Sequence, residues 1–320
     1  MPLSEFEIIT KYFSRPASGA NIVVGVGDDA AVVQFANDRH LVVATDTLVS
    51  GIHFPVDSPP HAVGYRALAV NLSDLAAMGA KPQWFFLNLS LPEADEQWLE
   101  GFAKGLFSLA DRYAIQLLGG DTVQGPLNIG ITVLGKVEPD AAMTRTGAKT
   151  GELICVSGTI GDAYLGLLAL QGKLATQDAS LINRFQYPEP RVGLGGILCG
   201  NASAAIDVSD GLHVDLARLL AASGLGGTVQ LANVPLSGQA REALTNEVKL
   251  RDLLSGGDDY ELCFTLPEQE FKDVQGSAAA FGVAVTNIGK VEQQPGLRWL
   301  DADDAIVDVP SEGYRHFDSG

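Results

Sequence analysis

Hydrophobic and polar positions follow two kinds of pattern along this chain. Short apolar, β-rich runs such as 41–45 and 84–91 alternate with longer segments whose apolar residues recur at the helical period, such as 61–78 and 94–113. This alternation predicts an α+β (mixed α/β) fold. Further strands are expected at 22–26, 115–118, 127–137, 153–157, 204–207, 228–231 and 260–266, and further helices at 4–13, 162–171, 191–200 and 211–222.

A polar, turn-rich stretch interrupts this pattern near the middle of the chain. Residues 138–150 read EPDAAMTRTGAKT, and the alternation of strands and helices begins again after them. A length of 320 residues is also typical of roughly two domains. We therefore expect an N-terminal domain over 1–138 and a C-terminal domain over 150–320.

The composition is acidic, yet rich in apolar residues. The chain has 39 acidic and 21 basic side chains, a formal net charge of −18, and 46% of its residues are hydrophobic. Such a charge repels nucleic acids and anionic membranes, so we expect no nucleic-acid partner and no membrane partner. The apolar residues are numerous enough to form a large core.

The first residues and the cysteines indicate a cytoplasmic protein. The N-terminus, MPLSEFEIITKYF, carries acids early and lacks the basic and apolar regions of a secretory signal, and no window approaches ~18 consecutive apolar residues. Cys155, Cys199 and Cys263 are odd in number and lie in apolar stretches. This usage predicts buried thiols in a reducing compartment, not disulfides or a zinc site.

Carboxylates recur in six short segments, where an apolar strand or helix is expected to end in a tight turn. Glycines in these segments permit positive φ and the close approach of a ligand. Ligands that are all oxygen suit Mg²⁺ far better than zinc. Taken singly, each segment is also explained as a turn whose aspartate accepts local backbone N–H groups, but the recurrence favours a metal site. The segments are GDDA at 27–30, TDT at 45–47, NLSD at 71–74, GGDT at 119–122, DVSDG at 207–211 and GGDDYE at 256–261.

Common nucleotide-binding and hydrolase motifs do not account for these segments. The Gly-Lys pairs at 135–136, 172–173 and 289–290 lack the following Ser or Thr of a P-loop. Residues 25–30 fit G-x-G-x-x-A, with Asp46 downstream, but two aspartates in that loop would repel a bare pyrophosphate. There is no G-x-S-x-G, no H-E-x-x-H and no EF-hand loop, so a serine hydrolase, a zincin and a calmodulin-like protein are not indicated.

A cluster of carboxylates without a P-loop is typical of phosphoryl transfer that depends on divalent ions. Carboxylates cannot bind ATP directly, so metal ions must lie between them and the phosphates. Arg145, in MTRTG, is a candidate cationic partner of phosphate oxygens. A solvated arginine in a linker is the alternative interpretation of this residue.

The motifs also occur in a recognisable order. GVGDDAAV, TDTLVSGIHF, AVNLSDLAAMGA, LLGGDT, MTRTGAK, IDVSDGL and SGGDDYELCF together resemble the motif series of the thiamine-monophosphate kinase family, which belongs to the superfamily of aminoimidazole-ribonucleotide synthetase and selenide, water dikinase. The resemblance covers essentially the whole chain. It implies ATP-dependent phosphorylation of thiamine monophosphate to thiamine diphosphate, by direct in-line transfer assisted by several Mg²⁺ ions.

The resemblance also implies an architecture and a set of site residues. We expect a homodimer whose N-terminal halves share a β-barrel, a C-terminal α/β half, and an ATP site between the domains. Asp74, Asp121 and Asp210 would be catalytic, with Asp28 as adjacent support. The metal ligands would be Asp29, Thr45, Asp46, Thr47, Asp74, Asp121, Asp207 and Asp210; ATP would contact Gly120, Asp121, Arg145 and Ser209; thiamine monophosphate would contact His53, Asp258 and Tyr314.

One position departs from the pattern of the family. Many relatives have a hydroxyl residue before Thr45, where this chain has Ala44, so one metal would lose a side-chain ligand or take water instead. His53, judged without the resemblance, is more readily a surface histidine. Trp299 and Tyr314 are aromatic candidates for the thiazolium cation, but core packing is the preferred interpretation of Trp299.

The chemistry of the acceptor agrees with these expectations. The second pKa of a phosphate monoester is about 6, so the acceptor is mostly a dianion at neutral pH and needs no general base. Two alternatives stay open: another ATP-using enzyme of the superfamily, or a non-catalytic protein that binds Mg-nucleotide. Within the superfamily, a selenide, water dikinase would have an N-terminal reactive cysteine, whereas the first cysteine here is Cys155.

Overall fold

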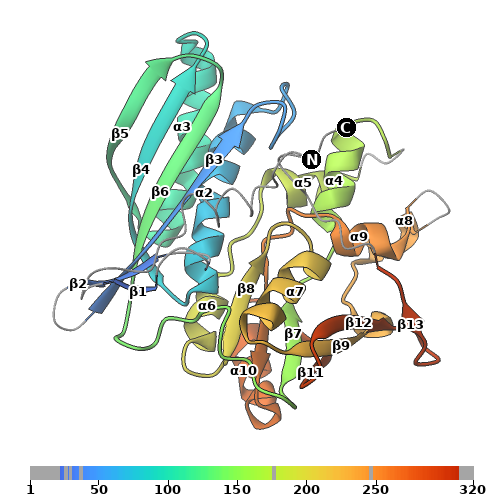
Figure 1. The fold of residues 1–320 in the computed structure, drawn as a ribbon. Helices are drawn as coiled ribbons and strands as arrows, with labels where there is room; N and C mark the ends of the chain where they lie inside the picture. Colours follow the sequence, from blue (N-terminus) through green and yellow to red (C-terminus); the bar gives the residue numbers. More distant parts are fainter. Residues whose placement is uncertain are drawn as a thin grey trace, which may run out of the picture.

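A computed structural model describes residues 22–24, 28, 31–35, 39–174, 178–244 and 248–309. Two mixed sheets, each with its own helices, form the body of the molecule (Figure 1). The expected helix 4–13 lies outside the described residues. No helix within the described ranges is long and apolar enough to cross a membrane.

The first sheet has the strand order β1-β2-β3-β6-β4-β5. Its neighbouring strands are antiparallel except β4 and β5, which run parallel. The central strands β3 and β6 pair over most of their length, from His40 opposite Val137 to Val49 opposite Asn128. The strands are β1 (Ile22–Val24), β2 (Ala31–Phe35), β3 (Arg39–Val49), β4 (Lys81–Leu91), β5 (Gln116–Gln124) and β6 (Asn128–Val137).

Helices α2 (Pro60–Ala77) and α3 (Glu96–Tyr113) pack against each other beside this sheet (Figure 1). Asp95 caps α3 by accepting the backbone N–H groups of Gln97 and Trp98. The two helices approach so closely that a Cβ at Gly64 would lie 2.0 Å from the Phe102 carbonyl oxygen. Glycine is therefore required where the two backbones meet.

The second sheet has the strand order β13-β12-β9-β11-β7-β10-β8. Its pairings are antiparallel except that of β9 with β12. Both β7 and β8 are buried along their whole length. The strands are β7 (Leu153–Ser157), β8 (Ala204–Val208), β9 (Gly226–Gln230), β10 (Glu261–Leu266), β11 (Val285–Glu292), β12 (Gly296–Leu300) and β13 (Ile306–Val307).

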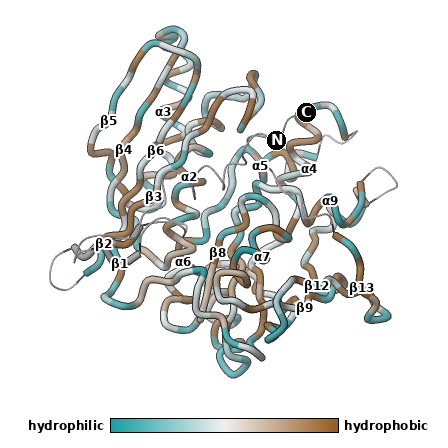
Figure 2. Tube along the Cα trace, in the orientation of Figure 1, coloured by the Kyte–Doolittle hydropathy of each residue, from teal (hydrophilic) through white to brown (hydrophobic). Residues whose placement is uncertain are grey.

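Short helices surround the second sheet. Hydrophobic residues follow the strands, whereas the outer loop beside β13 is hydrophilic (Figure 2). The helices are α4 (Asp162–Leu170), α5 (Ala179–Gln186), α6 (Val192–Leu198), α7 (Leu212–Ala222), α8 (Gly238–Ala243), α9 (Leu250–Ser255) and α10 (Phe271–Ala279), with 3₁₀ turns at Leu231–Asn233 and Glu268–Glu270.

Helix α2 lies between the two halves of the chain. It contacts α3, β3 and β6 on one side and α5, α6, β8 and β10 on the other. Ser73 donates a buried hydrogen bond of 2.8 Å to Asp207 in β8. A Cβ at Gly195 in α6 would lie 2.2 Å from the Ala76 carbonyl oxygen. Because neighbours surround α2, its apolar residues extend around the whole helix instead of forming one stripe.

Most of the expected elements are confirmed, with ends that differ by a few residues. Three of the six acidic segments, however, are not turns, and that expectation is wrong for them. Residues 45–47 lie inside β3, residues 71–74 inside α2, and residues 119–122 inside β5. In β5 the backbone stays extended enough to pair with β4 through Asp121, so the glycines continue the strand.

Candidate functional site

The acidic segment of β3 divides its side chains between the two faces of the first sheet. Side chains alternate along a strand, so Thr45 and Thr47 point away from Asp46. Both threonines are exposed, and Thr45 donates to the Ile131 carbonyl oxygen at 3.0 Å. Asp46 shares its face with the buried Ala44 and donates its backbone N–H to Asn71 of α2 at 3.0 Å. The structure thus joins Asp46, but neither threonine side chain, to α2.

The end of α2 carries the next polar group. Asn71 donates to the Ala67 carbonyl one turn earlier, which orients its amide oxygen toward Asp46. Ser73 is fully buried and binds Asp207, and Asp74 follows it at a half-buried position. Helix α2 therefore connects an aspartate of the first sheet with an aspartate of the second.

Asp121 lies on β5, the edge strand of the first sheet. It faces Asn88 of β4 in the ladder, is exposed, and accepts the N–H of Thr122 at 2.9 Å. Gly120, with φ +145°, allows β4 to approach, because a Cβ there would lie 1.7 Å from the Leu87 carbonyl oxygen. The glycine keeps this edge strand close to its neighbour and leaves the carboxylate of Asp121 facing solvent.

The segment after β8 is built around Asp215, which is only 1% exposed. Its Oδ2 accepts the backbone N–H groups of Ser209, Asp210 and Gly211 at 3.1, 3.0 and 3.1 Å. Arg218 lies 2.5 Å from Asp210 and 2.9 Å from Asp215. Three amides and an arginine thus fix this turn, so the direction of Asp210 is set before any ligand arrives.

The segment before β10 contains two non-glycine residues with left-handed backbone. Asp258 has φ +73° and Tyr260 has φ +50°, and each costs about 1–2 kcal/mol relative to an ordinary conformation. Their N–H groups donate to the carbonyls of Ser209 and Val208 at 2.8 Å. A Cβ at Gly257 would lie 2.2 Å from the Ser209 carbonyl oxygen. This turn therefore packs directly on the turn that carries Asp210.

Asp258 forms an ion pair with Arg66 of α2, a side chain that is 3% exposed. Arg66 also donates to the Phe185 carbonyl oxygen at 2.6 Å, and its guanidinium carbon lies 4.1 Å from the centre of the Phe185 ring. The Tyr260 hydroxyl donates to Asp258 at 3.4 Å. Asp258 is held by groups from both halves of the chain.

Tyr260 marks the place where acids of the two sheets meet. Burial raises the pKa of its phenol well above the usual value; Arg66 opposes this shift, and the carboxylates of Asp258, Asp46 and Asp207 add to it. These carboxylates come from a turn, from β3 and from β8. All three acidic residues also contact α2 directly: Asp46 binds Asn71, Asp207 binds Ser73, and Asp258 pairs with Arg66.

Two other residues singled out in the sequence have local partners. His53 accepts the backbone N–H of Val49 on Nδ1 at 2.9 Å, which leaves Nε2 to carry the proton. Next to it, a small pocket lies between Phe54, Arg66 and Phe185. The backbone N–H of Arg145 donates to the Asp28 carboxylate at 3.2 Å, so Arg145 is anchored and is not a solvated linker residue.

The remaining sequence expectations have mixed outcomes. Trp299 is 1% exposed and donates to His213 Nδ1 at 2.8 Å, so its expected place in the core is confirmed. Cys155, Cys199 and Cys263 are free thiols, as expected, although Cys199 is only half-buried. Asp29 and Tyr314 lie outside the described residues.

Two family models match this chain, one in each half of the sequence. The family model described as AIR synthase related protein, N-terminal domain, matches residues 27–137, and that of the C-terminal domain matches residues 149–300. A thiamine-monophosphate kinase of Escherichia coli strain K12 is 43% identical over 323 residues, covering 99% of each chain. The chain belongs to the thiamine-monophosphate kinase family.

Solved structures of thiamine-monophosphate kinases have the same fold. The enzyme from Stenotrophomonas maltophilia K279a is 44% identical, with a TM-score of 0.79, and the match covers 93% of this chain and 96% of that one. A structure described as AaThiL complexed with AMPPCP and TMP is 29% identical, with a TM-score of 0.85 over 99% of both chains. The expected α+β fold of the aminoimidazole-ribonucleotide-synthetase-like superfamily is confirmed.

The thiamine-monophosphate kinase motifs contain the acids of the site but not all the residues that hold them. Arg66, Asp215 and Arg218 were not singled out in the sequence, and each fixes a predicted aspartate or its turn. Asp215 had a visible signal, an acid in the first turn of a helix that follows DVSDG. No local sequence pattern indicates a role for Arg66, because its partner Asp258 lies in a distant part of the sequence.

The donor set of this thiamine-monophosphate kinase family member suits a hard cation. The described acids are carboxylates next to threonine and serine oxygens, the ligands that Mg²⁺ prefers. Within the described ranges, no three His, Cys, Asp or Glu side chains are grouped closely enough to hold a metal ion. The chemistry of the residues fits Mg²⁺, and complete coordination would require movement of side chains or oxygen atoms from the nucleotide.

Proposed function

We propose that this protein transfers the γ-phosphoryl group of ATP to thiamine monophosphate and forms thiamine diphosphate. Full-length likeness to thiamine-monophosphate kinases supports the reaction, and AaThiL was solved with AMPPCP, an ATP analogue, and TMP. The observation that carries the proposal is that Asp46, Asp207 and Asp258, which come from both halves of the chain, all contact α2. Acids from both halves then face one region, where two phosphorylated ligands can be brought together.

We assign the metal-holding role to the acids of the motif series. Asp46 is hydrogen-bonded to Asn71 of α2 and Asp207 to Ser73 of the same helix, and Asp74 is the next residue of that helix. Bound Mg²⁺ would screen the repulsion between two polyanions and neutralise charge on the transferred group. The proposed ligands are Asp29, Thr45, Asp46, Thr47, Asp74, Asp121, Asp207 and Asp210, and the proposed catalytic residues are Asp74, Asp121 and Asp210.

The residues proposed to bind ATP and substrate lie around these acids. Gly120, Asp121, Arg145 and Ser209 are proposed to contact ATP, and His53, Asp258 and Tyr314 to contact thiamine monophosphate. The backbone of Ser209 is fixed by its N–H bond to Asp215 and by the bond that its carbonyl oxygen accepts from Asp258. Asp258 and the aromatic ring of Tyr260 suit the thiazolium cation of the substrate. The acceptor phosphate is already largely dianionic at neutral pH, so these residues only have to bind and align it.

We further propose a homodimer that pairs through β5. This strand is a sheet edge, is exposed along its whole length, and carries the apolar side chains of Leu118 and Val123, each 52% exposed. An apolar sheet edge of this kind is a template for pairing with another strand. Residues 1–138 and 150–320 are proposed as the two domains. The net charge of −18 supports the absence of a nucleic-acid partner, and the free thiols of Cys155, Cys199 and Cys263 support the proposed cytoplasmic location.

A direct assay tests the proposed reaction. Purified protein incubated with Mg-ATP and thiamine monophosphate should form thiamine diphosphate, measured by chromatography, and a chelator should stop the reaction. Unphosphorylated thiamine serves as the control acceptor and should not react. Absence of product above background, together with measurable binding of Mg-ATP, would replace the kinase with the non-catalytic nucleotide-binding protein considered above.

One substitution tests the assignment of the acids. Asp74→Asn keeps the size of a half-buried side chain but removes its charge, so turnover should fall by about 100-fold or more while the melting temperature stays nearly unchanged. Turnover close to that of the wild type would show that Asp74 does not hold a metal.

A further inference from the structure

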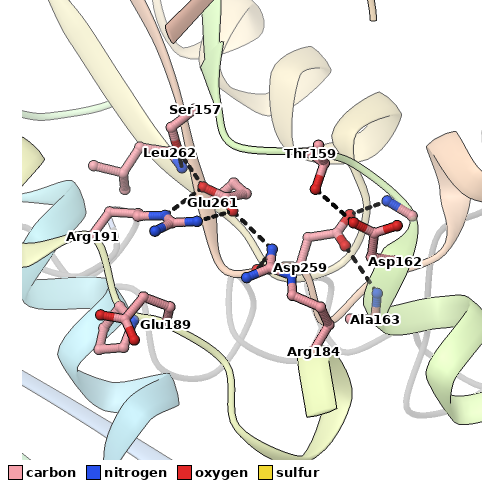
Figure 3. A network of polar contacts seen from close by, with 12 residues as sticks. Ser157, Thr159, Asp162, Ala163, Arg184, Glu189, Arg191, Asp259, Glu261 and Leu262 are labelled. Atoms are coloured by element: carbon pink, nitrogen blue, oxygen red, sulfur yellow. Dashed lines mark hydrogen bonds and ion pairs between the residues drawn. The ribbon is translucent and has the colours of Figure 1, made fainter. Parts of the chain in front are cut away.

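The turn that carries Asp258 is held from behind by a buried polar network. Asp258 and Tyr260 face α2, whereas Asp259 and Glu261 point into the protein and are fully buried. Figure 3 shows Arg184 and Arg191 converging on Glu261, while Asp259 faces the start of α4. The direction of Asp258 therefore depends on groups that do not themselves face the site.

Glu261 has enough partners to compensate for its burial. Arg191 donates to it through Nε at 2.6 Å and through a second guanidinium nitrogen, Arg184 donates at 2.8 Å, and Ser157 donates at 2.6 Å. Burial alone raises the pKa of Glu261, but Arg191 and Arg184 outweigh it and hold that pKa below its usual value. The carboxylate is a charged anchor at the first residue of β10.

Asp259 is anchored separately, at the N-terminus of α4. Its carboxylate accepts the backbone N–H of Gly161 at 2.7 Å and that of Ala163 at 3.4 Å. Arg184 donates to the Asp259 backbone carbonyl oxygen at 3.4 Å as well as to the Glu261 side chain. One arginine thus joins the backbone of the turn to the anchor that follows it.

Helix α5 holds both partners of the ion pair between Arg66 and Asp258. Arg184, near the end of this helix, donates hydrogen bonds to Asp259 and Glu261, the residues that follow Asp258. Phe185, the next residue, accepts a hydrogen bond from Arg66 on its carbonyl oxygen and packs its ring against the guanidinium group. A shift of this last helical turn would therefore move the carboxylate and its cation at the same time.

We propose that Arg184 is a positioning residue for Asp258: it fixes the turn 257–260 so that Asp258 is aimed at the cationic end of the acceptor substrate. This inference rests on the proposed function, because it assigns thiamine monophosphate to Asp258. Arg184 does not touch the substrate in this scheme. Its loss affects binding of the thiazolium-bearing acceptor and leaves the binding of ATP unchanged.

Arg184→Met tests the role with little risk to folding, because Glu261 keeps Arg191 and Ser157 as partners. The KM for thiamine monophosphate should rise about tenfold, while kcat and the KM for ATP should change less than about twofold. Arg184→Lys restores a cation beside Glu261 and should recover part of the affinity. Equal changes in both KM values, or none, would overturn the proposal.

A matched control and a double substitution exclude a general loss of structure. Arg298→Met removes an arginine of β12 that pairs with Glu292 of β11, two strands that do not pair with β10, and should leave the KM for thiamine monophosphate unchanged. In the Asp258→Asn background, Arg184→Met should no longer raise that KM. Additive effects would show that Arg184 does not act through Asp258.

The same experiment separates the two proposals. A wild-type protein that does not phosphorylate thiamine monophosphate overturns the proposed function and, with it, the role of Arg184. A wild-type protein that is active, with an Arg184→Met variant of unchanged KM, overturns only the role of Arg184. Differential scanning calorimetry of each variant shows whether the compared proteins are equally folded.

Discussion

The tripeptide Gly-Gly-Asp occurs twice among the acidic segments, at 119–121 and at 256–258, and it folds differently at each place. In the first it continues the edge strand β5 and leaves Asp121 exposed. In the second it forms a turn with positive φ at Asp258, whose carboxylate pairs with the buried Arg66. The same three residues therefore give a solvent-facing acid in one half and an acid held by the protein in the other.

What the two segments share is the role of the second glycine. At Gly120 and at Gly257 an added Cβ would lie 1.7 and 2.2 Å from a neighbouring carbonyl oxygen, that of Leu87 and that of Ser209. Gly-Gly-Asp thus indicates that another backbone approaches closely, not that the chain turns. The surroundings decide whether the aspartate faces solvent, as Asp121 does, or is held by an arginine of the protein, as Asp258 is.

The largest effects are expected when the aspartate of each Gly-Gly-Asp segment is replaced by asparagine. Asp121→Asn should lower kcat by about 100-fold or more, because its exposed carboxylate is assigned to metal and nucleotide, and stability should be unaffected. Asp258→Asn should instead raise the KM for thiamine monophosphate about tenfold with a smaller change in kcat. Steady-state kinetics with each substrate varied measures both. If the two variants have the same kinetic defect, the two aspartates do not have the different roles proposed for them.

A second prediction concerns the glycines of the first segment. Gly120→Ala should lower the free energy of unfolding by about 2–3 kcal/mol, because the methyl group forces β4 and β5 apart. Gly119→Ala is the matched control, since its φ of +157° strains an alanine much as the φ of +145° at Gly120 does, whereas the nearest side chain, Phe86, lies 3.8 Å from the added Cβ. Urea denaturation of both variants measures the difference in their free energy of unfolding. Equal stability would mean that β5 does not stay this close to β4.

The smallest expected effect is a pH dependence in the second segment. The pKa of Glu261 lies below its usual value of 4.5, so Glu261 adds stability above that pH, and the contribution is lost as the pH falls through its pKa in the folded protein. Below pH 4.5, wild-type stability should therefore fall more steeply than that of Glu261→Gln, by at most about 1.4 kcal/mol per pH unit. Urea titrations at pH 7, 4.5, 4 and 3.5 measure how the stability of each protein changes with pH, and parallel slopes below pH 4.5 would contradict the assignment.

The two Gly-Gly-Asp segments also show how far the sequence predicts this fold. The pattern predicts helix 61–78 within one residue of α2 at each end, because both hydrophobic period and glycine stop are local signals. It ends the strand at Leu118, whereas β5 continues to Gln124, because pairing with β4 overrides the turn preference of two glycines. Sequence distance hides such pairing partners.

The candidate site also contains residues that the sequence predicts and residues that only the structure reveals. The motif series contains the acids, since short acidic segments beside apolar runs are visible in the sequence itself. It does not contain Arg66 or Arg184, which neutralise and fix the second segment from helices far away in the sequence. A lone arginine in a helix is usually a surface residue, and only the folded structure shows that Arg66 is 3% exposed.

Helix α2 has a consequence for the way this protein is made. Ala76 and Ala77 belong to the same hydrophobic cluster as Leu194 and Leu198, and Ser73 binds Asp207. The ribosome completes α2 and the first sheet long before it makes the segment 194–207 that covers the other side of the helix. The growing chain therefore carries an apolar helix face that only its own later residues can bury, and aggregation competes with folding during that interval.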